Sequence, residues 1–217
     1  MVKHTEVIFV VDKSGSMGHL ADDTIGGFNS FIESQKDDTK TTLTTVLFDS
    51  SWKVLHDGLD IYEVSPMTNK DYIPGGMTAM LDAIGETINR VQDRHDDLGV
   101  EKPDNVLFVI TTDGQENSSR KFQKSQIERM IRHQTKSHGW EFIFLGANMD
   151  AVEEAASIGI SADKSITYNY DSTGVRGTYT TMACAANTIK SNATLNEFNL
   201  SEVYNQSTTA TINTSNK

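Results

Sequence analysis

Two apolar runs, each followed closely by a carboxylate, constrain this chain more than any other feature. The first is Val7–Val11, which leads into Asp12, and the second is Val106–Ile110, which leads through two threonines into Asp113. Runs of this kind are typical of strands that are buried on both faces of a parallel sheet. Strand-like and helix-like segments alternate along most of the chain, and this alternation predicts an α/β domain.

Apolar periodicity and turn signals place the expected elements along the sequence. Strands are expected at about 6–11, 41–48, 52–56, 106–112, 140–145 and 165–170, the second and third forming a hairpin. Helices are expected at about 20–35, 79–93, 124–137, 151–157 and 174–190. The charged stretch at 93–97 is interpreted as a solvated face and loop, since charge runs usually lie on the surface.

Oxygen-bearing side chains gather where these strands end. Asp12, Ser14 and Ser16 alternate after the first run, so in extended backbone they point to one side. A pair of glycines before Thr78 permits backbone conformations that other residues resist, which helps to bring Thr78 toward the strand ends. Carboxylate and hydroxyl oxygens suit a hard divalent cation such as Mg²⁺. The sequence therefore predicts a metal site at this edge of the sheet.

The three segments together resemble the metal-ion-dependent adhesion site of von Willebrand factor type A domains, in the stand-alone form found in bacteria and their phages. The resemblance covers most of the chain, from about residue 5 to residue 190. It implies a Rossmann-like, open, twisted and mostly parallel six-stranded sheet of order 3-2-1-4-5-6. Strand 3 would be antiparallel at the edge, and helices would flank both faces.

The resemblance also implies a ligand set and a function. Ser14 and Ser16 would bind the metal directly, Thr78 directly or through water, and Asp12 and Asp113 mainly through ordered waters. Bound Mg²⁺ (Mn²⁺ or Ca²⁺ being possible) would capture an Asp or Glu side chain of a partner protein. The resemblance thus implies a divalent-metal-dependent protein-binding module and not an enzyme.

Two alternatives stay open. A strand-end aspartate on an α/β sheet also describes metal-dependent phosphohydrolases and phosphotransferases, although Ser14 stands where those enzymes typically carry a second acidic residue. The other alternative is a scaffold in which the metal serves structure alone.

Composition narrows the partners and the location. The chain of 217 residues carries 30 acidic and 19 basic residues, a net charge of −11, which argues against binding nucleic acid. No apolar run approaches the ~20 residues of a membrane span, so no membrane partner is expected. The lone Cys184 is expected to be buried and inert, and a lone thiol favours a reducing compartment. Without a recognisable secretory signal, a cytoplasmic location is expected.

Several residues near the motif receive structural interpretations. Asp22 and Asp23 are expected to begin a helix, where its dipole favours carboxylates. Glu116 and Asn117 are expected to line the rim of the site, and His19 to lie on the surface. The type A domain is expected to span residues 1–190. Residues 191–217 are rich in Ser, Thr and Asn and are expected to form a flexible tail.

Overall fold

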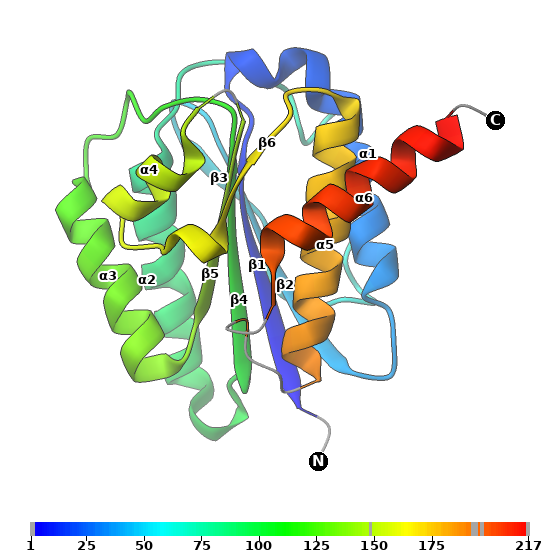
Figure 1. Cartoon of the computed structure of the whole chain (residues 1–217). Helices are drawn as coiled ribbons and strands as arrows, with labels where there is room; N and C mark the ends of the chain where they lie inside the picture. Colours follow the sequence, from blue (N-terminus) through cyan, green and yellow to red (C-terminus); the bar gives the residue numbers. More distant parts are fainter. Residues whose placement is uncertain (1–2, 148, 192–194, 196–197, 216–217) are drawn as a thin grey trace.

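The computed structural model describes residues 3–147, 149–191, 195 and 198–215. Its sheet has six strands in the order β3-β2-β1-β4-β5-β6, which confirms the predicted topology (Figure 1). The strands are β1 (His4–Asp12), β2 (Lys40–Phe48), β3 (Trp52–Asp60), β4 (Asn105–Thr112), β5 (Glu141–Ala147) and β6 (Ser165–Tyr168). The last strand ends two residues earlier than expected.

Strand β1 occupies the centre of the sheet and pairs in parallel with β2 on one side and β4 on the other. In this register Val11 lies opposite Leu47 and Thr111. The edge pair β2–β3 is antiparallel, as the hairpin prediction required. The carboxyl ends of β1 and β4 therefore meet at one edge of the sheet, which is where open α/β sheets bind ligands.

Helices cover both faces of the sheet (Figure 1). The helices α1 and α5 lie on one face, and α2, α3 and α4 lie on the other. The α-helices are α1 (Ala21–Ser34), α2 (Met80–Leu98), α3 (Lys124–His138), α4 (Ala151–Ser157), α5 (Ser172–Lys190) and α6 (Leu200–Ser215). Short 3-10 helices among the described residues include η1 (Gly15–Leu20), η2 (Gly99–Glu101) and η3 (Ala162–Lys164).

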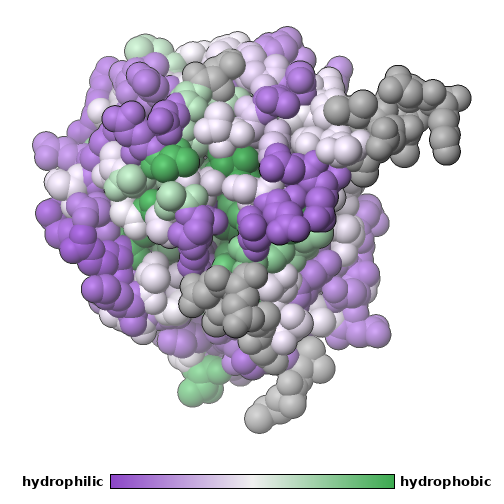
Figure 2. All heavy atoms as spheres, viewed as in Figure 1, coloured by the Kyte–Doolittle hydropathy of each residue, from purple (hydrophilic) through white to green (hydrophobic). Residues whose placement is uncertain are grey.

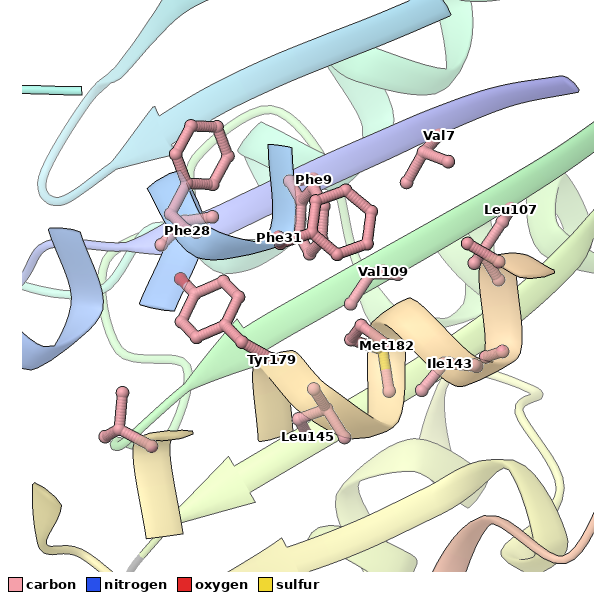
Figure 3. Packing of buried hydrophobic residues seen from close by; sticks show 14 of the residues in the cluster. Val7, Phe9, Phe28, Phe31, Leu107, Val109, Ile143, Leu145, Tyr179 and Met182 are labelled. Atoms are coloured by element: carbon pink, nitrogen blue, oxygen red, sulfur yellow. The ribbon is translucent and has the colours of Figure 1, made fainter. Parts of the chain in front are cut away.

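The core under α1 and α5 is built around the Phe9 side chain of β1 (Figure 3). The rings of Phe28 and Phe31 pack edge-on against Phe9, with centroids 5.8 and 4.9 Å away. The ring of Tyr179 lies so close to Gly27 that a Cβ at this position would overlap it. Gly27 therefore allows α1 and α5 to approach closely above the sheet, a use of glycine that no other residue can replace without repacking.

The opposite face buries a charged group among its apolar residues. The Glu6 carboxylate is 1% exposed and accepts hydrogen bonds from Thr44 (2.6 Å) and His95 (2.7 Å), and it pairs with Arg94. Burial would raise the pKa of Glu6, but the His95 hydrogen bond, the Arg94 charge and Thr44 outweigh it and hold the pKa below its usual range. The prediction of a loop at 93–97 was wrong, because α2 continues to Leu98 and the buried cluster pins its last turns.

The end of the chain differs from the expected flexible tail. Residues Leu200–Ser215 form α6, which packs against α5. Leu200 and Tyr204 are buried one helical turn apart, and the Tyr204 hydroxyl accepts a hydrogen bond from the Asn169 amide (3.0 Å). A Cβ at Gly177 would lie 2.6 Å from the Thr208 methyl group, so this glycine admits α6. Buried Leu200 and Tyr204 thus attach a segment of otherwise polar composition to α5.

On the face seen in Figure 2, hydrophilic residues dominate over α3, and hydrophobic ones show mainly between the elements. None of the described helices is long and apolar enough to cross a membrane. The prediction that Cys184 is buried was wrong: its side chain is exposed, because the inward positions of this turn of α5 belong to Ala185 and Ala186.

The Glu6 cluster generates a stability prediction. Glu6→Gln removes the negative charge opposite Arg94 and His95, and we expect a loss of about 3 kcal/mol in the free energy of unfolding, since breaking a buried ion pair leaves a charge uncompensated. Glu33→Gln is the matched control, because Glu33 forms an exposed pair with Lys36 and should cost less than about 1 kcal/mol. Urea unfolding monitored by circular dichroism measures both, and equal losses in the two variants would contradict this role.

The Glu6 cluster also predicts how the free energy of unfolding changes at acidic pH. The pKa of Glu6 is lower in the folded protein than in the unfolded chain, where it is about 4.3. The stabilisation of the fold by the Glu6 charge is therefore complete above the unfolded pKa and is lost as the pH falls through the folded-state pKa. The stability difference between parent and Glu6→Gln should therefore shrink as the pH drops below about 4. Unfolding free energies measured across this range test it, and a constant difference would contradict it.

Candidate metal centre

The structure brings the predicted site residues together at the carboxyl edge of β1 and β4. The hydroxyls of Ser14 and Ser16 lie 3.1 Å apart, and Ser16 donates a hydrogen bond to Asp113 Oδ1 at 2.8 Å. The Ser14 hydroxyl lies 3.4 Å from the same oxygen. Two hydroxyls from the turn after β1 thus converge on one carboxylate oxygen that follows β4.

Asp12 joins the turn after β1 to the end of β4 through hydrogen bonds. Its side chain is fully buried, and Oδ1 accepts the Ser14 amide while Oδ2 accepts the Thr112 hydroxyl, both at 2.6 Å. Burial raises the pKa of Asp12 to about 6, although the hydrogen bonds from Thr112 and Ser14 oppose the shift. The negative charge of Asp12 is therefore costly in the protein alone, and a cation nearby would stabilise it.

Asp113 carries one buried carboxylate oxygen with no hydrogen-bond partner among the described residues, although the Tyr170 side chain lies near this carboxylate. The side chain is 5% exposed, and Oδ2 is buried without a hydrogen-bond partner among the described residues. Buried carboxylate oxygens are rarely left unpaired, because desolvation without a partner costs free energy. A hard divalent cation would satisfy this oxygen. The described residues contain no cluster of three or more His, Cys, Asp or Glu side chains, so hydroxyls must complete any ligand set here.

Thr78 reaches the site through an ordered loop. Its hydroxyl oxygen would lie 3.6 Å from a Cβ placed on Gly114, the residue after Asp113, so it faces the Asp113 turn. Gly76 adopts a positive φ of 72°, and a Cβ there would meet the Ser50 hydroxyl at 2.7 Å. Only glycine fits this bend comfortably, which explains the second glycine of the pair before Thr78. Hydrogen bonds thus join Asp12, Ser14, Ser16 and Asp113, and Thr78 lies beside the Asp113 turn.

Solved structures share this architecture at low sequence identity. A von Willebrand factor type A structure from Catenulispora acidiphila matches with a TM-score of 0.55 at 14% identity, over 85% of this chain and 42% of that one. This chain has the fold of a von Willebrand factor type A domain. No protein-family model matches the sequence, and no curated protein matches it.

Two further solved structures share the fold of this chain. Proximal thread matrix protein 1 from the mussel byssus, in a structure with a zinc-occupied MIDAS motif, matches with a TM-score of 0.60 at 16% identity. The match covers 85% of this chain and 46% of the mussel protein. The PilB minor pilin of Streptococcus sanguinis matches with a TM-score of 0.57 at 10% identity, over 91% of this chain and 64% of the pilin. The chain thus spans less than two thirds of each of these proteins.

The candidate site also depends on residues whose roles the sequence did not indicate. Asn117 Oδ1 accepts the Thr78 amide (2.9 Å), and the Asn117 amide donates to the Thr78 carbonyl (3.1 Å). Glu116 accepts the Leu81 amide (2.9 Å) and so caps the start of α2. Both residues were expected at the rim, but they fix the backbone of the Thr78 segment. Their position three and four residues after Asp113 was the only available signal.

Aromatic side chains also contact the turn that carries Ser14 and Ser16, called the serine turn below. The Tyr170 hydroxyl, from the segment between β6 and α5, donates a hydrogen bond to the Ser16 carbonyl. Burial, together with the neighbouring Asp113 carboxylate, raises the pKa of Tyr170 above its usual range. His19 packs edge-on against the Tyr170 ring, with centroids 4.4 Å apart. Nothing in the sequence linked Tyr170 to the serine turn, because 154 positions separate it from Ser16.

The acidic pair at the start of α1 lies apart from the ligand set. Asp23 accepts hydrogen bonds from the Ser172 hydroxyl (2.6 Å) and from Arg176 (3.2 Å), which joins α1 to α5. Asp22 is exposed in the first turn of α1. These contacts agree with the interpretation of both residues as helix-start residues.

Asn117 supplies a test of the supporting contacts. Asn117→Ala removes the acceptor of the Thr78 amide, so Thr78 should be held less firmly, and we expect the affinity for Mg²⁺ to fall about tenfold. Asn89→Ala is the control, since Asn89 is exposed on α2 away from the site. Isothermal titration calorimetry with metal-stripped proteins measures the affinities. Unchanged affinity in Asn117→Ala would show that Thr78 does not depend on this contact.

Proposed function

We propose that this type A domain is a divalent-metal-dependent protein-binding module whose bound Mg²⁺ captures an acidic side chain of a partner protein. The metal would be held by Asp12, Ser14, Ser16, Thr78 and Asp113. The observation that carries the proposal is the convergence of the two serine hydroxyls on Asp113, whose second oxygen is buried without a hydrogen-bond partner among the described residues.

The donor set favours a hard cation. Three hydroxyls and two carboxylates supply oxygen ligands only, which suits Mg²⁺ and is compatible with Mn²⁺ and Ca²⁺. The zinc-occupied motif of the mussel protein supports a divalent cation at the corresponding place. When bound, such an ion supplies an open coordination position for an oxygen from outside the chain.

Charge balance favours an acidic partner group. The two carboxylates of the site can at most match the charge of a divalent cation, and Asp12 is buried with both oxygens already hydrogen-bonded. The ion therefore keeps an affinity for a further anion at the exposed side. A carboxylate from an Asp or Glu of another protein fits this requirement in charge and in ligand type.

The same geometry argues against the enzymatic alternatives. An aspartate nucleophile needs a free carboxylate oxygen that can reach a substrate, and Asp12 has neither a free oxygen nor exposure. Ser14 donates its hydroxyl within the site and occupies the position of the second acidic residue in aspartyl-phosphate enzymes. Binding is thus the better supported function, and a scaffold with a structural metal is the alternative that the experiment below separates. The cytoplasm remains the proposed location, on the ground of the single cysteine.

Metal titration of Asp113→Ala tests the site. This variant removes the carboxylate with the unpaired oxygen, and we expect Mg²⁺ binding to be lost while the fold is retained. Asp22→Ala removes an exposed carboxylate at the same end of the domain and should bind Mg²⁺ like the parent. Calorimetry measures binding and circular dichroism measures folding. Equal binding by the parent and Asp113→Ala would refute the assignment.

Asp12→Ala should behave differently from Asp113→Ala. It leaves the Ser14 amide and the Thr112 hydroxyl without their buried acceptor, so we expect a loss of about 2–3 kcal/mol in unfolding free energy in addition to the loss of metal binding. Denaturant unfolding in the presence of a chelator separates the two effects. Full stability of Asp12→Ala under these conditions would contradict the structural role of this carboxylate.

Stabilisation by the metal and capture of a partner are measured separately. Saturating Mg²⁺ should stabilise the protein, by about 2.7 kcal/mol at a hundred times the dissociation constant. A metal-binding domain that retains no protein or peptide in a magnesium-dependent way would support the structural-metal alternative.

A further inference from the structure

Helix α3 is positively charged on an otherwise acidic protein. Residues 120–138, which include α3, hold six of the 19 basic residues of the chain and one of its 30 acidic residues. This stretch therefore has a net charge of +5, although the whole chain has a net charge of −11. A surface charge opposite to that of the rest of the protein attracts partners that the remaining surface repels.

Three of these cations form one exposed row on α3, called the basic row below. Arg129, Arg132 and Lys136 are three and four positions apart, so their side chains are neighbours on the helix surface. Arg132 pairs with Glu128, but Arg129 and Lys136 have no ion-pair partner among the described residues. Like charges at this spacing disfavour a helix, so the stability of α3 does not explain the basic row.

A groove of about 460 Å³ lies between α2 and α3, beside the basic row. Arg129 and His133 line its α3 side, and Ile88, Phe122 and Met130 contribute apolar surface. The two helices lie side by side on one face of the sheet (Figure 1). Ile88 lies eight residues after the start of α2, about 12 Å along the helix axis from the edge that carries the candidate metal centre. The groove is therefore separate from that site.

Two glutamine side chains bring buried acceptor atoms to this groove, which both of them line. Gln134 is 4% exposed, and its Oε1 is buried without a hydrogen-bond partner among the described residues. The Oε1 of Gln92 is likewise buried without a described partner, and its Nε2 donates to Asp96 Oδ1 at 2.7 Å, which fixes the orientation of this amide. Buried oxygens normally accept a hydrogen bond, so the groove suits a ligand that carries N–H donors.

We propose that the groove and the basic row form a second binding site, which takes an extended acidic segment of a partner protein. The site goes beyond the proposed function, because no metal takes part in it. Carboxylates of the segment pair with Arg129 and Lys136, and its backbone N–H groups donate to Gln92 and Gln134. Lys136 lies seven residues after Arg129, about 10.5 Å along α3, a distance that about three residues of extended chain span.

The distribution of charge and donors selects this ligand among the alternatives. Outside residues 120–138 the chain has 13 basic and 29 acidic residues, so a long nucleic acid that follows the basic row soon meets surface of its own charge. A helical segment offers few free N–H groups, because most are bonded within the helix. An extended acidic segment supplies both the carboxylates and the donors.

A peptide selection without metal tests the second site. The domain is biotinylated at Cys184, which is exposed on α5 on the opposite face of the sheet, and is offered a random peptide library on phage in EDTA. We expect the peptides eluted by high salt to carry two or more Asp or Glu residues within about four positions, since salt weakens exposed ion pairs. Selected peptides without this acidic pattern, or no selected peptide, would overturn the proposal.

Two charge-matched double variants locate the contact. Arg129→Gln/Lys136→Gln should bind a selected peptide about tenfold more weakly than the parent in fluorescence anisotropy, because two ion pairs are lost. Lys53→Gln/Lys70→Gln removes the same charge from exposed lysines that also have no ion-pair partner among the described residues, and it should bind like the parent. Equal affinities of the two double variants would overturn the proposal, because overall charge alone would then attract the peptide.

Gln134→Met tests the groove itself. The substitution removes the buried amide at similar volume, so the free energy of unfolding should not fall, while the affinity for the selected peptide should drop about fivefold. Urea unfolding and fluorescence anisotropy measure the two quantities. A fall in stability, or an unchanged peptide affinity, would show that the Gln134 oxygen does not serve the ligand and would overturn the role of the groove.

The second site and the metal site fail independently. Asp113→Ala should bind the selected peptide like the parent in EDTA; a loss would place the peptide at the metal edge, overturn the second site and leave the proposed function standing. Tighter binding of a labelled single-stranded oligonucleotide, with the same sensitivity to Arg129→Gln/Lys136→Gln, would assign the basic row to nucleic acid instead. Absence of Mg²⁺ binding would refute the proposed function without affecting the second site.

Discussion

The buried Asp12 carboxylate is the interaction on which the site depends. One oxygen receives the Ser14 amide and the other receives the Thr112 hydroxyl, so a single side chain ties the turn after β1 to the end of β4. The Tyr72 hydroxyl adds a hydrogen bond to the Asp12 carbonyl (2.5 Å). This tie sets where the serine hydroxyls point, and the central, parallel pairing of β1 supplies the frame for it. A residue chosen only for ligation would not need to be so deeply enclosed.

The remaining parts of the site are held by backbone contacts between separate loops. The Thr78 segment is fastened to Asn117 on one side and to the β2–β3 turn on the other, where the Ala79 amide donates to the Asp49 carbonyl. Glu116 caps α2 directly after that segment. The start of helix α2 and the loop that carries Thr78 are thus held by two neighbouring residues, Glu116 and Asn117. The position of Thr78 therefore depends on how α2 packs, and the candidate site depends on several elements at this edge of the sheet.

The sequence predicted those features that are encoded locally. The runs ending at Asp12 and Asp113 disclosed buried neighbouring strands, and the alternation of Asp12, Ser14 and Ser16 disclosed a shared face. Features that depend on pairs distant in sequence escaped. Glu6 and His95 look like surface residues until the fold places them together, and Tyr170 reaches Ser16 from far along the chain. The polar composition of residues 191–217 predicted a flexible tail and not α6, because it gives little weight to the few buried side chains, Leu200 and Tyr204.

The exposed thiol on α5 has a practical consequence. Cys184 is the single cysteine of the chain and faces solvent, so a maleimide dye or spin label can attach at one defined position without any substitution. Helix α5 starts at Ser172, at the ligand-bearing edge of the sheet, and Cys184 lies twelve residues further along, roughly 18 Å down the helix axis. A label attached to Cys184 would therefore be remote from the candidate site and would not occupy it.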